Sequence, residues 1–209
     1  MGHIMKKNLF IFELANNHQG SIKKAFNLIS AAKRLSKSKY MNFAVKLQYR
    51  DLKTFIHKKA NKNKNKHINR FLETKLTTSE FSKICKKIKG NNLKLVITPF
   101  DENSVKRAVK DKCDFLKIAS CSNKDWPLLE EVSKHNKPVI CSTGGLNLDE
   151  IDNLYSFFSH KKLNFSLLHC VSIYPTDKMQ NFNIKFIGKM IRRYPGCKIG
   201  YSGHETENN

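Results

Sequence analysis

Residues 115–145 read FLKIASCSNKDWPLLEEVSKHNKPVICSTGG, and this stretch decides the fold class. The apolar runs Phe115–Ile118 and Val139–Cys141 predict two buried strands. Between them, Pro127 suits the first turn of a helix. Small polar residues follow each strand at once. A strand, a helix and a second strand with polar groups at the carboxyl ends form the repeating unit of an α/β barrel, whose active site lies at one mouth.

The same alternation extends in both directions from this stretch. Five more apolar runs predict strands, at Leu9–Leu14, Phe43–Leu47, Leu93–Ile97, Phe165–Leu168 and Lys198–Tyr201. The first of these is rich in Phe and Ile, which is typical of a strand buried on both faces. Helices lie between the strands: Ser21 is a predicted N-cap, and Thr77–Glu80 carries the signature of a capping box.

The strand count favours a TIM (β/α)₈-type barrel that is truncated after about its seventh strand. A closed barrel needs eight strands and typically about 250 residues, whereas this chain has 209 residues. An open barrel would leave its first and seventh strands as exposed edges. An open doubly wound sheet is the alternative, and it is weakened because no Gly-x-Gly-x-x-Gly motif follows the first strand.

Composition predicts one cytoplasmic domain. The chain is 40% hydrophobic, which suffices for a real core, and it has no apolar run that resembles a membrane span or a signal peptide. Residues 1–4 resemble a cloning remnant, which leaves 5–209 as a single, incomplete barrel domain. The six cysteines lack metal-type spacing, and Cys141 and Cys170 lie inside apolar runs, as expected of buried thiols in a reducing cytosol.

The formal net charge is +22. Lysines are spread along nearly the whole chain, and the densest run, residues 58–66, contains no aromatic residue. This pattern argues against a nucleic-acid-binding face, which would gather its cations and interleave aromatic residues. A positive field also steers an anionic small substrate toward the protein. The long basic segment after Leu47 is predicted to be a loop that acts as a lid or a mobile segment.

Three charged residues stand at or near predicted strand ends. Glu13 ends an apolar strand, where a carboxylate is costly unless it is used or paired, and we favour use over a structural ion pair. Lys46 and Lys117 lie inside buried-strand patterns, where lysine needs a partner. Two such lysines suit an anionic substrate, one of them can instead form a Schiff base, and the structural alternative is a lysine whose ammonium group reaches solvent.

Hydroxyl and imidazole groups complete the candidate set. Short hydroxyl donors recur next to Gly or Ala at successive strand ends, where they can cradle a phosphate: Ser120, Ser142, Thr143 and Ser202. His18, His169 and His204 are candidate metal ligands, although a single histidine is more often a hydrogen-bonded structural residue. His204 is the best of the three, because it lies in a Gly-flanked loop beyond a strand.

The ordered set of motifs resembles the sialic acid synthase family, whose members make nonulosonic acids and include spore-coat polysaccharide synthases. The matching segments cover essentially the whole chain after Met5: residues 13–20, 46–48, 98–100, 117–120, 142–144, 169–176 and 199–204. The resemblance implies a TIM barrel that condenses phosphoenolpyruvate with an N-acyl amino-hexose and uses Mn²⁺ or Mg²⁺ at its mouth.

The resemblance also assigns roles to residues. It implies that phosphoenolpyruvate is held by Lys46, Lys117, Ser120, Ser142 and Ser202. It places Gln48 beside that site, Glu13 near the reacting carbons or the sugar, Tyr174 toward the sugar and His204 on the metal. Two substrate contacts depart from the family pattern, because Ser172 stands where many members carry Asn and Ser122 where some carry Glu.

The resemblance further implies parts that this sequence lacks. In the family, an eighth strand supplies a second histidine ligand, and an antifreeze-like C-terminal domain reaches into the active site of a partner, so that the full-length form is a homodimer. We therefore expect weak or no activity from this chain alone. Two other readings stay open: a Schiff-base aldolase that uses Lys117 or Lys46, and a non-catalytic basic scaffold or nucleic-acid-binding fragment.

Overall fold

The computed structural model describes residues 7–60, 65–173, 175, 176, 178 and 181–205. The chain forms two compact units that meet in sequence between Asp114 and Phe115. We call them the N-terminal unit and the C-terminal unit. The predicted cloning remnant, residues 1–4, and Tyr174 lie outside the described residues.

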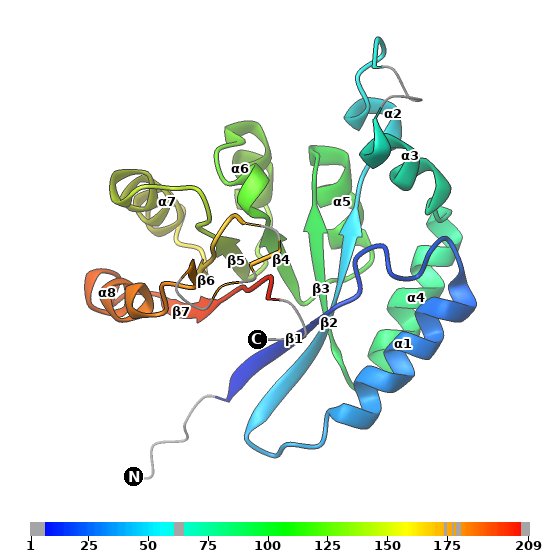
Figure 1. Cartoon of the computed structure of the whole chain (residues 1–209), viewed down its shortest axis with the longest axis horizontal. Coiled ribbons are helices and arrows are strands. Elements are labelled where there is room, and N and C mark those ends of the chain that lie inside the picture. The colour runs from blue at the N-terminus through cyan, green and yellow to red at the C-terminus, as the bar shows by residue number, and fades with distance from the viewer. Residues whose placement is uncertain (1–6, 61–64, 174, 177, 179–180, 206–209) are drawn as a thin grey trace. The chain divides into compact units, whose positions relative to one another are not determined.

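The N-terminal unit contains three parallel strands in the order β1-β2-β3. Its strands are β1 (Asn8–Glu13), β2 (Met41–Tyr49) and β3 (Lys94–Pro99). Its helices are α1 (Ile22–Leu35), α2 (Leu52–Phe55), α3 (Lys66–Glu73), α4 (Thr78–Gly90) and α5 (Glu102–Lys110). Helices α1 and α4 pack side by side (Figure 1). Strand β3 is buried from Leu95 to Pro99, as its continuous apolar sequence predicts.

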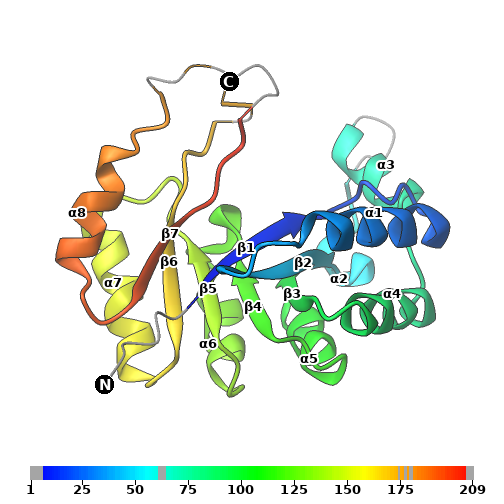
Figure 2. The same ribbon diagram turned by 90° about the horizontal axis from the view of Figure 1, so that it is seen from below.

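The C-terminal unit contains four parallel strands in the order β4-β5-β6-β7. These are β4 (Phe115–Ile118), β5 (Val139–Ser142), β6 (Phe165–His169) and β7 (Lys198–Tyr201). The helices are α6 (Trp126–Ser133), α7 (Leu148–His160) and α8 (Lys185–Arg193), and a short 3₁₀ helix spans Ser120–Ser122. Helices α7 and α8 are neighbours (Figure 2), joined by the ion pair of Asp152 with Arg193.

The predicted local signals are confirmed. The Ser21 side chain accepts a hydrogen bond from the Lys24 N–H at the start of α1. Thr77 and Glu80 form the expected reciprocal capping box of α4. Pro127 lies in the first turn of α6. All seven predicted strands are present, and alternating parallel strands and helices confirm the α/β class.

The prediction that the first strand is buried on both faces is wrong. Strand β1 alternates exposed and half-buried residues, and the Phe10 side chain is 49% exposed. The reason is that β1 pairs with β2 along one side only, so it is an edge of the N-terminal unit. Strand β7 pairs with β6 alone among the described strands of its unit. Both strands are therefore edges, as the seven-strand count predicts.

The basic segment after β2 is not the long loop that its composition predicts. It contains the helices α2 and α3. Asn65 caps α3 by accepting hydrogen bonds from the backbone N–H groups of His67 and Ile68. The short apolar stripe of Ile68 and Phe71 then packs one face of α3 inward. Lysine and asparagine surround this stripe in the sequence and obscure its helical spacing.

The cysteine prediction holds for the two thiols that it names. Cys141 and Cys170 are buried and free of disulfide bonds, and burial raises the pKa of the Cys141 thiol to about 12. The Cys141 thiol is therefore protonated at neutral pH, and both buried thiols pack as small apolar groups. Within the described part of the chain, no helix combines the length and the apolar composition needed to span a bilayer.

Candidate active site

Glu13 and Lys46 form an ion pair at the ends of neighbouring strands. The two residues are register partners in the parallel pair of β1 and β2, and the Lys46 ammonium lies 2.5 Å from Glu13 Oε2. The backbone N–H of Ala15 donates to the other carboxylate oxygen at 2.9 Å. The Lys46 side chain is only 15% exposed, whereas that of Glu13 is 41% exposed. The pair is thus partly open, so it can both stabilise the strand ends and meet a ligand.

The segment after Glu13 is tightly wound. Ala15 and Gln19 adopt positive φ angles of 42° and 49°, which are uncommon for residues with a side chain. Such strain often marks a functional loop. His18 is buried in this loop, and its Nδ1 accepts a hydrogen bond from the Gly20 N–H at 3.1 Å. Burial lowers the pKa of His18, so the ring is held neutral with its proton on Nε2.

The lowered pKa of His18 predicts an acid-sensitive fold. Below the ordinary histidine pKa of about 6.5, the unfolded chain takes up a proton that the folded ring resists. The unfolding free energy should therefore be fully present above pH 6.5 and fall as the pH drops toward the folded pKa. Urea unfolding at pH 7.5 and 5.5 measures this. A His18→Asn variant keeps an acceptor for Gly20 but does not titrate, so it should show a flatter pH dependence, and an unchanged slope would contradict the assignment.

Arg50 orients Gln48 near the end of β2. The Arg50 Nη2 donates to Gln48 Oε1 at 2.8 Å, so the NH₂ group of Gln48 is the part of the amide that can donate to a ligand. The guanidinium group is itself held over the ring of Phe100, at 3.9 Å from its centroid, and over Phe71, at 4.4 Å. The aromatic contacts fix Arg50, and Arg50 in turn fixes the predicted substrate contact Gln48.

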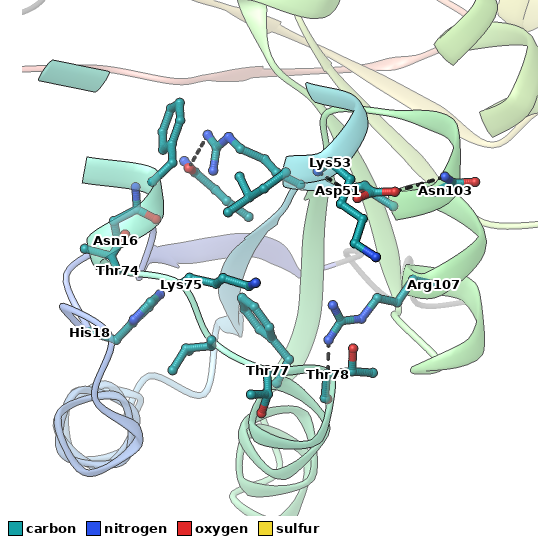
Figure 3. A pocket seen from close by; sticks show the side chains of 17 residues that line it. Asn16, His18, Asp51, Lys53, Thr74, Lys75, Thr77, Thr78, Asn103 and Arg107 are labelled. Carbon is teal, nitrogen blue, oxygen red and sulfur yellow. Dashed lines mark hydrogen bonds between the residues drawn. The ribbon is translucent and has the colours of Figure 1, made fainter. Parts of the chain in front are cut away.

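A cavity of about 470 Å³ lies next to Gln48 in the N-terminal unit. Asn16 and His18 from the loop after β1 line it together with residues from α2, the α3–α4 segment and α5 (Figure 3). Its volume falls in the range of small-molecule sites, about 300–1,000 Å³. The N-terminal unit therefore offers a ligand-sized cavity beside a predicted site residue.

Lys117 is buried at the end of β4 in the C-terminal unit. The residue is only 3% exposed. The ammonium group donates to Ser142 Oγ at 2.5 Å and to the Ile118 carbonyl at 3.2 Å. Strands β4 and β5 pair in register from Leu116 to Ile118, which brings these two predicted site residues together. A buried cation bonded to a hydroxyl at the carboxyl ends of strands is suited to an incoming anion.

A second cavity, of about 440 Å³, lies in the C-terminal unit. Lys117 and Ser142 are not among its lining residues, but Asn123, which lines it, donates to the Ser142 carbonyl. Three predicted site residues line it: Ser120, Ser172 and His204. Gly144 also lines it, and a methyl group at Gly144 would stand only 2.5 Å from Ser172 Oγ and 2.6 Å from Ser120 Oγ. The absence of a side chain at this position is what lets both hydroxyl groups face the cavity. Ser202 is not among the lining residues, and its N–H donates to the His169 carbonyl.

Two residues that the sequence analysis did not select also shape these sites. The buried Asn123 donates from Nδ2 to the carbonyls of Ser142 and Gly144, at 3.2 and 3.0 Å, and pins the loop after β5. The Thr98 hydroxyl is buried, and no described residue hydrogen-bonds it. Because Thr98 is the register partner of Gln48, its hydroxyl is a candidate ligand contact. Thr98 belongs to the sequence motif at residues 98–100, whereas no local sequence pattern predicts a role for Asn123.

The three candidate metal ligands have different surroundings. His169 Nε2 donates to the Phe182 carbonyl at 2.8 Å, and His18 bonds its own loop, so both are held by structural hydrogen bonds. His204 lines the cavity of the C-terminal unit. Among the described residues, no group of three His, Cys, Asp or Glu side chains is close enough together to hold a metal ion. These residues alone therefore do not fit a complete metal centre.

Each unit thus brings together part of the predicted set. Glu13, Lys46 and Gln48 come from adjacent strands of the N-terminal unit, and Lys117, Ser120, Ser142, Ser172 and His204 come from the C-terminal unit. These features define an α/β protein that carries lysine and hydroxyl groups at the carboxyl ends of parallel strands. Comparison with known proteins identifies it further: the model of the NeuB family matches residues 29–209, and the chain belongs to that family.

Solved structures confirm the barrel-type fold. The spore coat polysaccharide biosynthesis protein E of Chromobacterium violaceum is 40% identical, with a TM-score of 0.92 over 97% of this chain and 60% of its own. The N-acetylneuraminic acid synthetase of Leptospira borgpetersenii is 29% identical, with a TM-score of 0.85 over 96% of this chain and 66% of its own. The expected relationship to the sialic acid synthases is therefore confirmed.

A curated relative gives the same picture. The N-acetylneuraminate-9-phosphate synthase of Drosophila melanogaster is 27% identical over 98% of this chain and 56% of its own length. The chain spans about half the length of the curated relatives that it matches.

Proposed function

We propose that this chain carries phosphoenolpyruvate-binding machinery of a synthase that condenses phosphoenolpyruvate with an N-acyl amino-hexose. The product is a sialic-acid-like nonulosonic acid, and phosphate is released. The observation that supports this proposal best is the buried Lys117 ammonium bonded to Ser142 at 2.5 Å. Membership of a family whose relatives bear the name of sialic acid synthases adds to it.

In this proposal Lys117 neutralises negative charge on the phosphate or carboxylate of phosphoenolpyruvate. Charge-assisted hydrogen bonds from an ammonium group are stronger than neutral ones and suit a partly desolvated site. Ser120 and Ser142 donate hydroxyl protons to the same anion, and Ser202 is proposed to join them. Ser172 faces the cavity of the C-terminal unit and is proposed to contact substrate there, as is Tyr174.

Glu13, Lys46 and Gln48 are proposed to serve the acceptor sugar and the reacting carbons, with Lys46 also contributing to phosphoenolpyruvate binding. The methylene carbon of phosphoenolpyruvate attacks the aldehyde of the open-chain sugar and forms the new carbon–carbon bond, while the π bond of the aldehyde breaks and its oxygen takes up a proton to become a hydroxyl group. Water adds to the cationic carbon that results, loses a proton, and phosphate then leaves with cleavage of its C–O bond. Fixed positive groups stabilise the charge that moves onto the departing phosphate.

A divalent ion remains part of the proposal. Mn²⁺ or Mg²⁺ would polarise the sugar aldehyde as a Lewis acid when bound. His204 is the ligand that the C-terminal cavity offers, and the described residues supply no complete set. Further ligands must then come from outside the described residues or from substrate and water.

Direct binding tests the proposal. Calorimetric titration of the full chain with phosphoenolpyruvate should give saturable one-to-one binding that weakens as salt rises, because charge carries the contact. Pyruvate lacks the phosphate and serves as the matched ligand; it should bind about tenfold more weakly or worse. Equal affinity for the two compounds would overturn the proposal.

The burial of Lys117 also suits the second reading, a Schiff-base aldolase, because desolvated lysines form imines readily. Treatment with borohydride in the presence of pyruvate distinguishes the two. A covalent adduct on Lys117 or Lys46, found by mass spectrometry, would favour the aldolase. An unmodified chain that binds phosphoenolpyruvate would favour the synthase.

A further inference from the structure

The cavity of the N-terminal unit has a strongly positive wall. Four cationic side chains line it: Arg50, Lys53, Lys75 and Arg107. Asp51 is the one carboxylate among its lining residues. His18 adds no charge, since burial lowers its pKa and keeps the ring neutral. The resemblance assigns no role to Lys53, Lys75 or Arg107.

Three of these cations extend into the same space from different elements. Lys53 comes from α2, Lys75 from the segment between α3 and α4, and Arg107 from α5, and Figure 3 shows all three pointing into the cavity. Like charges that converge in a confined site repel one another. A bound anion between them would replace this repulsion with attraction.

Arg107 is the fixed member of this group. Its guanidinium lies 4.6 Å from the Tyr49 ring centroid and 5.0 Å from that of Phe81, and Nη2 donates to the Thr78 carbonyl at 3.3 Å. A guanidinium held in this way loses little conformational entropy when an oxyanion binds. Lys53 and Lys75 are exposed, and a lysine carries its ammonium group on a flexible four-carbon stem, so they can close on the ligand.

The nearby carboxylate is already engaged. Asp51 Oδ1 accepts from the backbone N–H of Lys53 at 3.1 Å, and Oδ2 accepts from Asn103 at 3.1 Å. It caps α2 through the first of these bonds. Outside the lining, Asp111 also faces this group, with its Oδ2 3.7 Å from Arg107 Nε. These two carboxylates do not balance four cations, and the Thr78 hydroxyl is a further candidate donor on the wall.

We propose that this cavity binds the phosphomonoester group of a small molecule, with Lys53, Lys75 and Arg107 as the phosphate contacts. Phosphate accepts several charge-assisted hydrogen bonds at once, which matches a converging set of ammonium and guanidinium donors. The phosphate can belong to the acceptor sugar of the proposed reaction or to a separate ligand. Phosphate binding in this cavity does not depend on the proposed function. Only the assignment of the phosphate to the acceptor sugar rests on it.

The test is calorimetric titration of the full chain in a Lys117→Met background, which keeps phosphate binding at Lys117 out of the signal. The probes are inorganic phosphate, an N-acyl amino-hexose 6-phosphate and the same sugar without phosphate. Adding Lys53→Met and Lys75→Met should weaken binding of the phosphorylated probes about tenfold or more, since two charges are lost. Lys110→Met, on the exposed side of α5, is the matched control and should change nothing.

The affinities of the three probes distinguish a phosphate on the acceptor sugar from a phosphate on a separate ligand. Tighter binding of the sugar phosphate than of either other probe assigns the phosphate to the acceptor, and equal binding of inorganic phosphate assigns it to a separate ligand. Either result supports the site. Phosphate affinity that survives the double lysine change, or that is absent when Lys117 alone is replaced, overturns it. Failure of phosphoenolpyruvate to bind the unaltered chain counts against the proposed function and leaves this site standing.

Discussion

Replacement of Lys117 by Met is expected to remove most phosphoenolpyruvate binding while leaving the fold as stable as before, or more stable. A hydrogen bond to a charged group contributes about 1.5–3 kcal/mol, which corresponds to roughly 10- to 160-fold in the dissociation constant. Methionine has nearly the shape of lysine without its charge. In a position only 3% exposed, an apolar side chain of similar volume is often neutral or stabilising.

The two readouts separate a ligand-binding lysine from a structural one. If the ammonium group served only to hold Ser142 and the Ile118 carbonyl, Lys117→Met would lower the midpoint of thermal unfolding and leave the remaining folded chains able to bind. Titration calorimetry gives the affinity, and circular dichroism gives the unfolding midpoint. Lys189→Met, at an exposed position of α8 in the same unit, is the matched control. Affinity unchanged in Lys117→Met would count against the proposed site.

Much of the fold is predictable from sequence because its strands are short apolar runs and its helices carry caps. Thr77 and Glu80 mark the start of α4 through side-chain chemistry that is entirely local. The exposure of β1 is not local, since it depends on which strand faces each of its edges. Helix α2 escaped prediction because it is only four residues long, and α3 because its short apolar stripe follows a run of lysine and asparagine.

The candidate site likewise has residues that the sequence predicts and contacts that it does not. The sequence predicts Glu13, Lys46 and Lys117 as site candidates, because a charged side chain within an apolar strand is unfavourable unless it is paired or used. The sequence does not predict the partners of these residues, since the contact of Glu13 with Lys46 requires the register of β1 against β2. Asn123 holds the loop after β5 from a distance of about twenty residues along the chain. No sequence pattern predicts such a contact.

Substitution of Ala for Gly144 should crowd the cavity of the C-terminal unit, which this glycine lines. The new Cβ would lie 2.5 Å from Ser172 Oγ, 2.6 Å from Ser120 Oγ and 3.2 Å from the Cys170 carbonyl. The loop cannot move away easily, because Asn123 holds the carbonyls of Ser142 and Gly144. The serine hydroxyls must therefore turn out of place, and overpacking of this kind costs about 1–3 kcal/mol.

We expect Gly144→Ala to weaken phosphoenolpyruvate binding about tenfold or more and to lower the unfolding free energy by about 1–3 kcal/mol. Gly90→Ala is the matched control: nothing lies within 4 Å of a methyl group there, and a helical Gly→Ala change should be mildly stabilising. Calorimetry and urea unfolding measure both effects.

A combined variant separates crowding from a general disturbance of the loop. Ser120→Ala and Ser172→Ala, added to Gly144→Ala, remove the two oxygen atoms that the new methyl group meets most closely. Stability should then return, because the closest contacts are gone. Affinity should stay low, because the hydroxyl donors are gone as well. If affinity returned together with stability, the two serines would be packing residues, and the ligand contacts of this cavity would have to be sought elsewhere.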